Sequence, residues 1–172
     1  MAKYVGFGIE EYITKLNVLT KKSQGMCKQA VYDGADIVAD AIRASTEKLP
    51  VTSNSAEAYR AHNITGEGGV TITGVTALQK QGLLEGLGIA KMETKGGGAN
   101  TSVGFHGYNK QKGYLNTTEK GQPNRMIAAS VESGTSFRAK HPFVSPAIRR
   151  SRAAAEAAMV KRFEEEINKT MK

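Results

Sequence analysis

The chain has 172 residues, of which 40% are apolar and 6% aromatic, and this is enough for a single domain, residues 1–172, with a modest aliphatic core. The formal charge of +8 favours contact with polyanions such as nucleic acid, or with acidic protein surfaces. The lone cysteine, Cys27, excludes an intrachain disulfide, and no apolar stretch approaches the ~18 residues of a membrane-spanning helix. We therefore expect a soluble, intracellular protein without a membrane span, in which Cys27 is a small, partly buried residue of a helix.

The N-terminal part of the sequence has the apolar spacing of a long amphipathic helix. Apolar residues recur every three or four positions and predict one helix from about Ile9 to Lys48. Pro50 ends it, because the residue before a proline is pushed out of helical geometry. The stretch Ser23–Gly25 could interrupt this helix, and Gly34 would weaken it unless that glycine marks close packing against another element.

A polar segment, Thr52–Gly74, follows the helix and is rich in Ser, Asn, Gly and Thr. Its apolar residues are too scattered to offset the entropy cost of fixing the backbone, so we expect a mobile loop or flap here. Val70 and Ile72 alternate with threonines, as in a strand. A partner's sheet edge could therefore capture the flap as an added strand, the alternative being a surface loop that never orders.

The central part of the chain has two patterns that are typical of short strands. Gly88–Glu93 and Thr101–His106 are expected to pair, because Gly96–Gly98 between them can adopt the positive φ angles that a hairpin loop needs. Val103 and Phe105 would lie on one face of the second strand. The sequence therefore predicts a small antiparallel sheet.

Three further segments flank this hairpin. Val75–Leu84 is predicted to form a short helix, and Tyr108–Asn124 is polar and expected to be exposed. Met126–Glu132 alternates like a strand but has the alanine content of a helix, so both interpretations remain open.

A second long helix is predicted after Pro142. Ser145 is a favourable N-cap, and Pro146 suits the first helical position, where its missing N–H costs nothing. Residues four positions apart are expected to pair on its surface: Arg152 with Glu156, Lys161 with Glu165, and Arg162 with Glu166. Such pairs contribute only about 0.2–0.5 kcal/mol each, so an apolar stripe must also pack against another element. The order of elements predicts an α+β fold with a long N-terminal amphipathic helix, a small antiparallel sheet and a long C-terminal helix.

The sequence lacks the motifs of common enzymes and metal sites. Its histidines, His62, His106 and His141, are far apart and have no Cys or His partner at a ligand spacing. There is no nucleophile-elbow or phosphate-loop motif, and carboxylate pairs such as Glu10-Glu11 have no acid–base partner. We therefore expect no enzymatic activity, no metal and no cofactor.

Basic residues cluster just before and within the start of the last helix: Arg138, Lys140, Arg149, Arg150 and Arg152. Arginines in the first two turns oppose the helix dipole, so an external partner such as a phosphate backbone or an acidic protein surface would explain them. The alternative is a solvated helix end whose charges are balanced by neighbouring carboxylates. Only Phe137 and Phe143 could stack on bases nearby, so sequence-specific recognition of single strands is not expected.

Two motifs near the C-terminus, a Glu-X-Gly-Thr turn and a later Pro-Phe-X-X-Pro-Ala, together resemble the hallmark of a known family. Their residues are Glu132, Gly134, Thr135, Pro142, Phe143 and Pro146. In these motifs the chain resembles the phage tail-completion and head–tail joining proteins, small neck proteins of tailed phages and prophages that are often called minor tail components. Gly82–Leu87 and Val103–Phe105 are similar to two further elements of that family.

The residue types in the two motifs also suggest local roles. Gly134 permits a tight turn, and Glu132 or Thr135 can satisfy nearby backbone N–H groups. The two prolines stiffen the approach to the helix, which lowers the entropy lost when the segment is fixed. Phe143 is an apolar anchor with two open placements, the core of its own subunit or the surface of a neighbour.

The resemblance implies a structural protein of a virion or prophage-derived particle, assembled in the cytoplasm of the bacterial host. Copies of the chain would form a homo-oligomeric ring, for example a hexamer, at the junction of head or neck and tail. Such a ring seals the tail tube or adapts it to the connector, so its partners are itself, the tail tube and the neck or connector proteins. The six motif residues become candidate subunit-interface residues. A basic protein that contacts DNA non-specifically is the alternative function.

Overall fold

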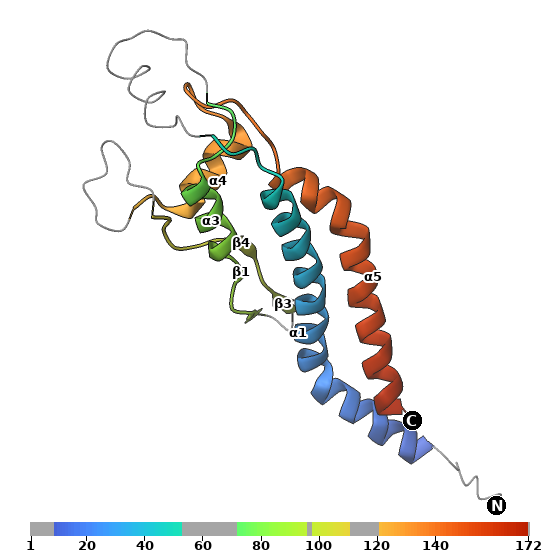
Figure 1. Ribbon diagram of the computed structural model, residues 1–172. Helices are drawn as coiled ribbons and strands as arrows, with labels where there is room; N and C mark the ends of the chain where they lie inside the picture. The colour runs from blue at the N-terminus through green and yellow to red at the C-terminus, as the bar shows by residue number, and fades with distance from the viewer. Residues whose placement is uncertain (1–8, 53–71, 96–97, 111–120, 172) are drawn as a thin grey trace, which may run out of the picture.

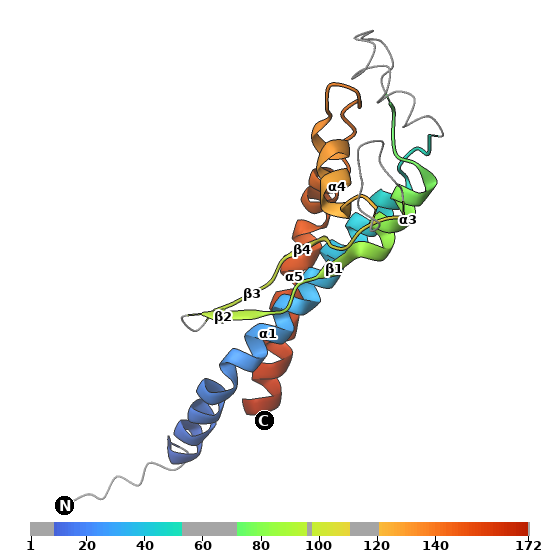
Figure 2. The same cartoon turned by 90° about the vertical axis from the view of Figure 1, so that its left-hand side faces the viewer.

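The computed structural model describes residues 9–52, 72–95, 98–110 and 121–171 (Figure 1). Helices and short antiparallel strands alternate along the chain, and a long helix stands at either end, so the predicted α+β class is confirmed. The two long helices, α1 (Ile9–Glu47) and α5 (Val144–Met171), run antiparallel beside each other. The shorter elements pack around the upper part of this pair (Figures 1 and 2).

α1 is a single helix that passes through Ser23–Gly25 without a break, so the predicted interruption there is wrong. Figure 1 shows that the helix bends in its blue, N-terminal part. Side-chain hydroxyls return to the backbone in this part, from Thr20 to the carbonyl of Leu16 at 2.9 Å and from Ser23 to that of Thr20 at 2.8 Å. Such bonds often bend helices. Cys27 is half-buried, as predicted.

α1 and α5 approach each other most closely at Gly34. A Cβ atom there would lie 2.8 Å from Cε of Met159, so only a glycine lets the two helices come this close, and the predicted close packing is confirmed. Further up, Arg150 Nη2 donates a hydrogen bond to Oγ of Ser45 at 3.3 Å. These contacts fix the register of the antiparallel pair.

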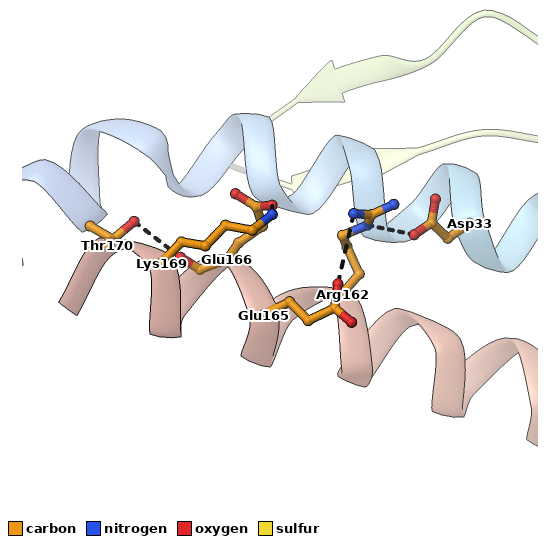
Figure 3. A network of polar contacts seen from close by, with 6 residues as sticks. All are labelled: Asp33, Arg162, Glu165, Glu166, Lys169 and Thr170. Atoms are coloured by element: carbon orange, nitrogen blue, oxygen red, sulfur yellow. Dashed lines mark hydrogen bonds and ion pairs between the residues drawn. The ribbon is translucent and has the colours of Figure 1, made fainter. Parts of the chain in front are cut away.

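A polar network holds the lower part of the pair together (Figure 3). Arg162 Nε donates to Oδ2 of Asp33 on α1 at 2.6 Å, and its Nη1 lies 3.9 Å from Glu165 Oε2. Glu166 pairs with Lys169 at 2.7 Å. The prediction that Arg162 pairs with Glu166 is therefore wrong, because the carboxylate of Asp33 takes the guanidinium. Glu165 likewise lies by Arg162 rather than by the lysine four residues before it.

Backbone bridges close the base of the segment 52–74. Thr52 N–H donates to the carbonyl of Val75 at 2.8 Å, and Val75 N–H to that of Pro50 at 3.0 Å. Ile72 is buried and bonds the backbone of residues 137 and 139 at 2.9 Å. The flap prediction is thus wrong at its C-terminal end, because Ile72 already pairs within its own chain. The remainder of that prediction, at 53–71, lies outside the described residues.

The predicted short helix is confirmed as α3 (Ala77–Gly86). It begins with a reciprocal cap, in which Thr76 Oγ1 accepts from Gln79 N–H at 3.2 Å and Gln79 Oε1 accepts from Thr76 N–H at 3.1 Å. This is the Ser/Thr-X-X-Glu/Gln capping box, whose sequence signature stands in the chain. The cap sets the direction in which α3 crosses the end of α1.

The predicted hairpin is present and projects from the side of α1 (Figure 2). Its strands are β1 (Leu87–Ile89), β2 (Glu93–Lys95), β3 (Gly98–Asn100) and β4 (Val103–Phe105). β1 pairs antiparallel with β4, and β2 with β3, so each predicted strand is split into two short pieces. Val103 and Phe105 share the half-buried face, as predicted.

α4 (Asn124–Ser133) settles the ambiguous stretch Met126–Glu132 as a helix. Ile127, Ala128 and Val131 are buried, which is a helical spacing, and they complete the main core. That core consists of Leu49, Val75, Leu83, Ile127, Ala128, Val131 and Phe143.

The polar stretch before α4 differs from the prediction at both ends. Asn109 and Asn124 are each only 2% exposed, whereas Tyr108–Asn124 was expected to be exposed. Tyr108 and Pro123 form an antiparallel bridge that draws these two ends into the fold. Residues 111–120 lie outside the described residues.

Candidate functional site

The two sequence motifs meet at the joint between α4 and α5. After α4 ends, Thr135 and Arg138 bond each other's backbone, with Thr135 N–H donating at 2.9 Å, and so close a tight turn. The chain then passes back along α4, where His141 N–H donates to the carbonyl of Val131 at 2.8 Å. α5 begins three residues later, at Val144. The motifs are therefore the outgoing and returning arms of one loop.

Gly134 makes the first arm possible. Its φ of +79° lies in the region that side chains rarely adopt, and a Cβ atom there would lie 3.1 Å from the backbone N of Lys140. Its N–H also closes α4 by donating to the carbonyl of Ser130 at 3.0 Å. The predicted tight turn at Gly134 is confirmed.

Glu132 joins the two motifs directly. Its Oε2 accepts the N–H groups of Phe143 at 2.8 Å and Val144 at 2.9 Å. Its Oε1 accepts the N–H of Ser145 at 3.0 Å and the Ser145 hydroxyl at 2.5 Å. The first N–H groups of any helix lack partners within that helix, and a carboxylate at this position also meets the positive end of the helix dipole. Glu132 is thus the cap of α5, supplied from another helix.

This arrangement changes the acidity of Glu132. Burial, the largest single influence, raises the pKa of the carboxyl group. The hydrogen bonds from the Ser145 hydroxyl and from the N–H groups of Val144, Phe143 and Ser145 lower it, and together they hold the pKa of Glu132 below its ordinary value. Glu132 therefore stays ionised into mildly acidic solution.

The predicted cap of α5 is consequently wrong. The helix begins at Val144, so Ser145 lies within its first turn and donates its hydroxyl to Glu132 instead of accepting from the helix. Pro146 also lies inside the first turn, one of the positions where a missing N–H leaves nothing unsatisfied. Pro142 is exposed in the returning arm. The expectation that Glu132 serves nearby donors is corrected as well, because its donors lie 11 to 13 residues further along.

Phe143 lies in the core of its own subunit, which settles the two placements left open by the sequence. It is 3% exposed and belongs to the main core. Its ring centroid is 5.9 Å from that of Phe105 on β4, at an interplanar angle of 48°. Phe143 therefore anchors the start of α5 to the hairpin and is not a surface residue for a neighbouring subunit.

Arg138 does not belong to a basic surface, contrary to the prediction. It is 4% exposed, its Nη1 donates to the carbonyl of Gly74, and its Nη2 lies 3.5 Å from Gln79 Oε1. Burial lowers the pKa of this guanidinium. The reason is the pairing of residues 137 and 139 with Ile72, which turns the side chain of Arg138 inward. Arg138 thus ties the turn to the start of α3 and is not available to a polyanion.

The other predicted basic residues, Lys140, Arg149, Arg150 and Arg152, are exposed. Arg152 forms the predicted ion pair with Glu156 at 2.8 Å, although both side chains are more than half exposed. The cluster is thus present on the surface, with four members in place of five.

Sequence reasoning missed a buried contact around α3. A Cβ atom at Gly82 would lie 2.3 Å from Cβ of Asn109, and one at Gly86 would lie 2.3 Å from the carbonyl O of His106. Asn124 fills the same space and donates from Nδ2 to the His106 carbonyl at 2.8 Å. The signal in the sequence was the four-residue spacing of the two glycines, which clears one face of a helix for a backbone.

The described residues show no cluster of three or more His, Cys, Asp or Glu side chains that could hold a metal ion. His106 and His141 are both exposed, and His62 lies outside the described residues. Among the helices of the described ranges, none is long and apolar enough to cross a membrane.

Comparisons with known proteins do not place the chain in a family. No family model matches the sequence, and neither the curated proteins nor the solved structures yield a significant similarity.

Proposed function

We propose that the chain is a structural subunit of a phage or prophage-derived particle. In this proposal copies form a ring at the junction of head or neck and tail, as a tail terminator or tail-completion protein. The observation that carries it is the joint between α4 and α5. There, the two halves of the motif that resembles the tail-completion family form one unit, joined by the carboxylate of Glu132.

The contacts of the motif residues support a structural role over an enzymatic one. Glu132, Gly134 and Phe143 serve backbone N–H groups, a turn and the core of their own chain. Their contribution to a ring is therefore indirect, because they set the direction in which α5 leaves the head of the molecule. This revises the expectation that these residues form the subunit interface themselves.

Exposed apolar residues at the other end of the molecule are the surface that neighbours would cover. Tyr12, Ile13 and Leu16 in the first turns of α1 are 40–55% exposed, and Val160 and Ile167 on α5 are 56% and 38% exposed. Contiguous apolar surface on a subunit commonly marks a protein interface. Other copies of the chain, the tail tube and the connector are the proposed partners, and the virion is the proposed location.

The size of the purified chain in solution tests this function. We expect sedimentation to give a mass of several subunits, and negative-stain images to show closed rings. A chain that remains monomeric across the micromolar range, and that is missing from purified particles of its source, would contradict the proposal.

A basic DNA-binding protein is the second candidate, because Lys140, Arg149, Arg150 and Arg152 are exposed on one end of α5. If all four met phosphates of duplex DNA, a plot of log affinity against log salt would have a slope of about −3 to −4. Such a slope, measured on a chain that stays monomeric, would favour this candidate over the ring.

A further inference from the structure

Two exposed surfaces of opposite charge lie on the helical pair. The first, here called the basic face, consists of Ile148, Arg149 and Arg152 on α5. The second, the acidic face, consists of Asp36, Asp40 and Glu47 on α1. The spacing within each set places its members on one side of their helix. The two faces belong to different helices and share no residue.

The charges on these faces are largely uncommitted within the subunit. Among the ion pairs of the described residues, none involves Arg149, Asp36 or Asp40, and Arg152 has only its exposed partner Glu156. Arg43, the one basic residue among the three acids, turns its Nη1 to the carbonyl of Leu84 on α3 at 3.3 Å. Like charges held together without partners repel one another, so each face gains from a complementary surface.

The register of the pair places both faces at the same height. Position 150 lies opposite 45, and position 162 lies opposite 33. Along antiparallel helices each step up one helix matches a step down the other, so Arg149 and Arg152 stand level with positions 46 and 43. Those positions fall between Glu47 and Asp40.

We propose that neighbouring subunits pack side by side, with the basic face of one copy against the acidic face of the next. The interface is heterologous, because two different surfaces meet. Equal height lets the arginines reach the carboxylates when the neighbour is rotated but hardly shifted along the helices, and such a contact closes into a ring instead of winding into a filament. The inference rests on the proposed ring and names its repeating contact.

Charge reversal of one face at a time tests this contact. The first variant carries Arg149→Glu with Arg152→Glu, and the second carries Asp40→Lys with Glu47→Lys. Control variants make the same changes in net charge elsewhere on the exposed surface, Lys91→Glu with Arg125→Glu, and Glu85→Lys with Glu93→Lys. Circular dichroism checks the fold of each, and analytical ultracentrifugation at low and physiological salt gives the mass of the wild type, each variant and the equimolar mixture of the two face variants.

We expect each face variant alone to need at least a tenfold higher concentration to assemble, while both controls assemble like the wild type. Mixing the two face variants should restore assembly, because every contact then joins an all-acidic subunit to an all-basic one. Face variants that assemble like the wild type, or a mixture that stays monomeric, would overturn this interface while leaving the ring intact. A monomeric wild type would overturn the ring itself, and the interface with it.

Discussion

The head of the molecule, where the short elements pack on the upper part of the helical pair, differs from its stem, the first turns of α1 beside the last turns of α5. In the head, Leu49, Val75 and Leu83 are at most 2% exposed. In the described stem, residues 10–25 and 156–171, no residue is buried, and large apolar side chains such as Ile13 face solvent. The head is therefore complete within one chain, and the stem is the part left for neighbours to cover. Changes in the head should act on stability, and changes in the stem on assembly.

The largest expected loss of stability comes from Phe143→Ala in the head. Removing a buried phenylalanine costs about 3–5 kcal/mol, because the ring's contacts are lost and a cavity remains. We expect the melting temperature to collapse and assembly to fail only as a consequence of unfolding. Chemical denaturation of the purified variant measures the change. An unchanged melting temperature together with soluble monomers would place Phe143 at an interface and contradict its assignment to the core.

A pair of helical glycines compares head and stem directly. Gly82→Ala should destabilise the chain by about 1–3 kcal/mol, because the added methyl meets Cβ of Asn109. Gly25→Ala meets nothing within 4 Å and lies inside α1, so it should stabilise by up to about 1 kcal/mol. Thermal melts of both variants decide the matter, and equal effects of the two substitutions would remove the distinction drawn here.

Glu132→Gln tests the joint and its pH dependence. The neutral amide keeps one acceptor but brings an N–H₂ group toward three backbone donors, so we expect a loss of about 1.5–3 kcal/mol at neutral pH. Because the folded state holds the pKa of Glu132 below its ordinary value, its contribution is complete above that ordinary value. The contribution is then lost as pH falls through the lowered pKa.

Denaturation of the wild type and of Glu132→Gln at several pH values from 7 to 3 measures this effect. The stability difference between the two should shrink as the solution becomes acidic. Glu164→Gln, on the exposed face of α5, is the matched control and should show no such trend. A gap between wild type and Glu132→Gln that stays constant down to pH 3 would show that the carboxylate does not cap α5.

The smallest expected effect on stability comes from the stem. Ile13→Ser and Leu16→Ser replace side chains that are 50% and 40% exposed, so each should change stability by about 0.5 kcal/mol or less. In the ring proposal both substitutions weaken assembly nevertheless, because they remove apolar surface that a partner covers. Sedimentation and thermal melts of the same samples separate the two effects. Assembly at wild-type concentrations would free this surface of any role.

The elements that sequence reasoning predicted well are those governed by local patterns. The long helices follow from apolar spacing, and the hairpin from alternation around Gly96–Gly98. The errors concern contacts made at a distance. Nothing near Glu132 indicates that its carboxylate reaches the start of α5, and the inward turn of Arg138 depends on pairing with Ile72 far along the chain. The acidic and basic faces were only half visible, because their common height depends on the register of α1 against α5.

A reconstruction of the particle that contains this chain tests the central claim most directly. The account predicts a closed ring between head or neck and tail, in which the joint at Glu132 keeps its intramolecular hydrogen bonds while Tyr12, Ile13 and Leu16 of the stem are covered by neighbouring chains. A particle that lacks the chain, or a ring whose subunits meet through Phe143 and the joint while the stem remains in solvent, would contradict it.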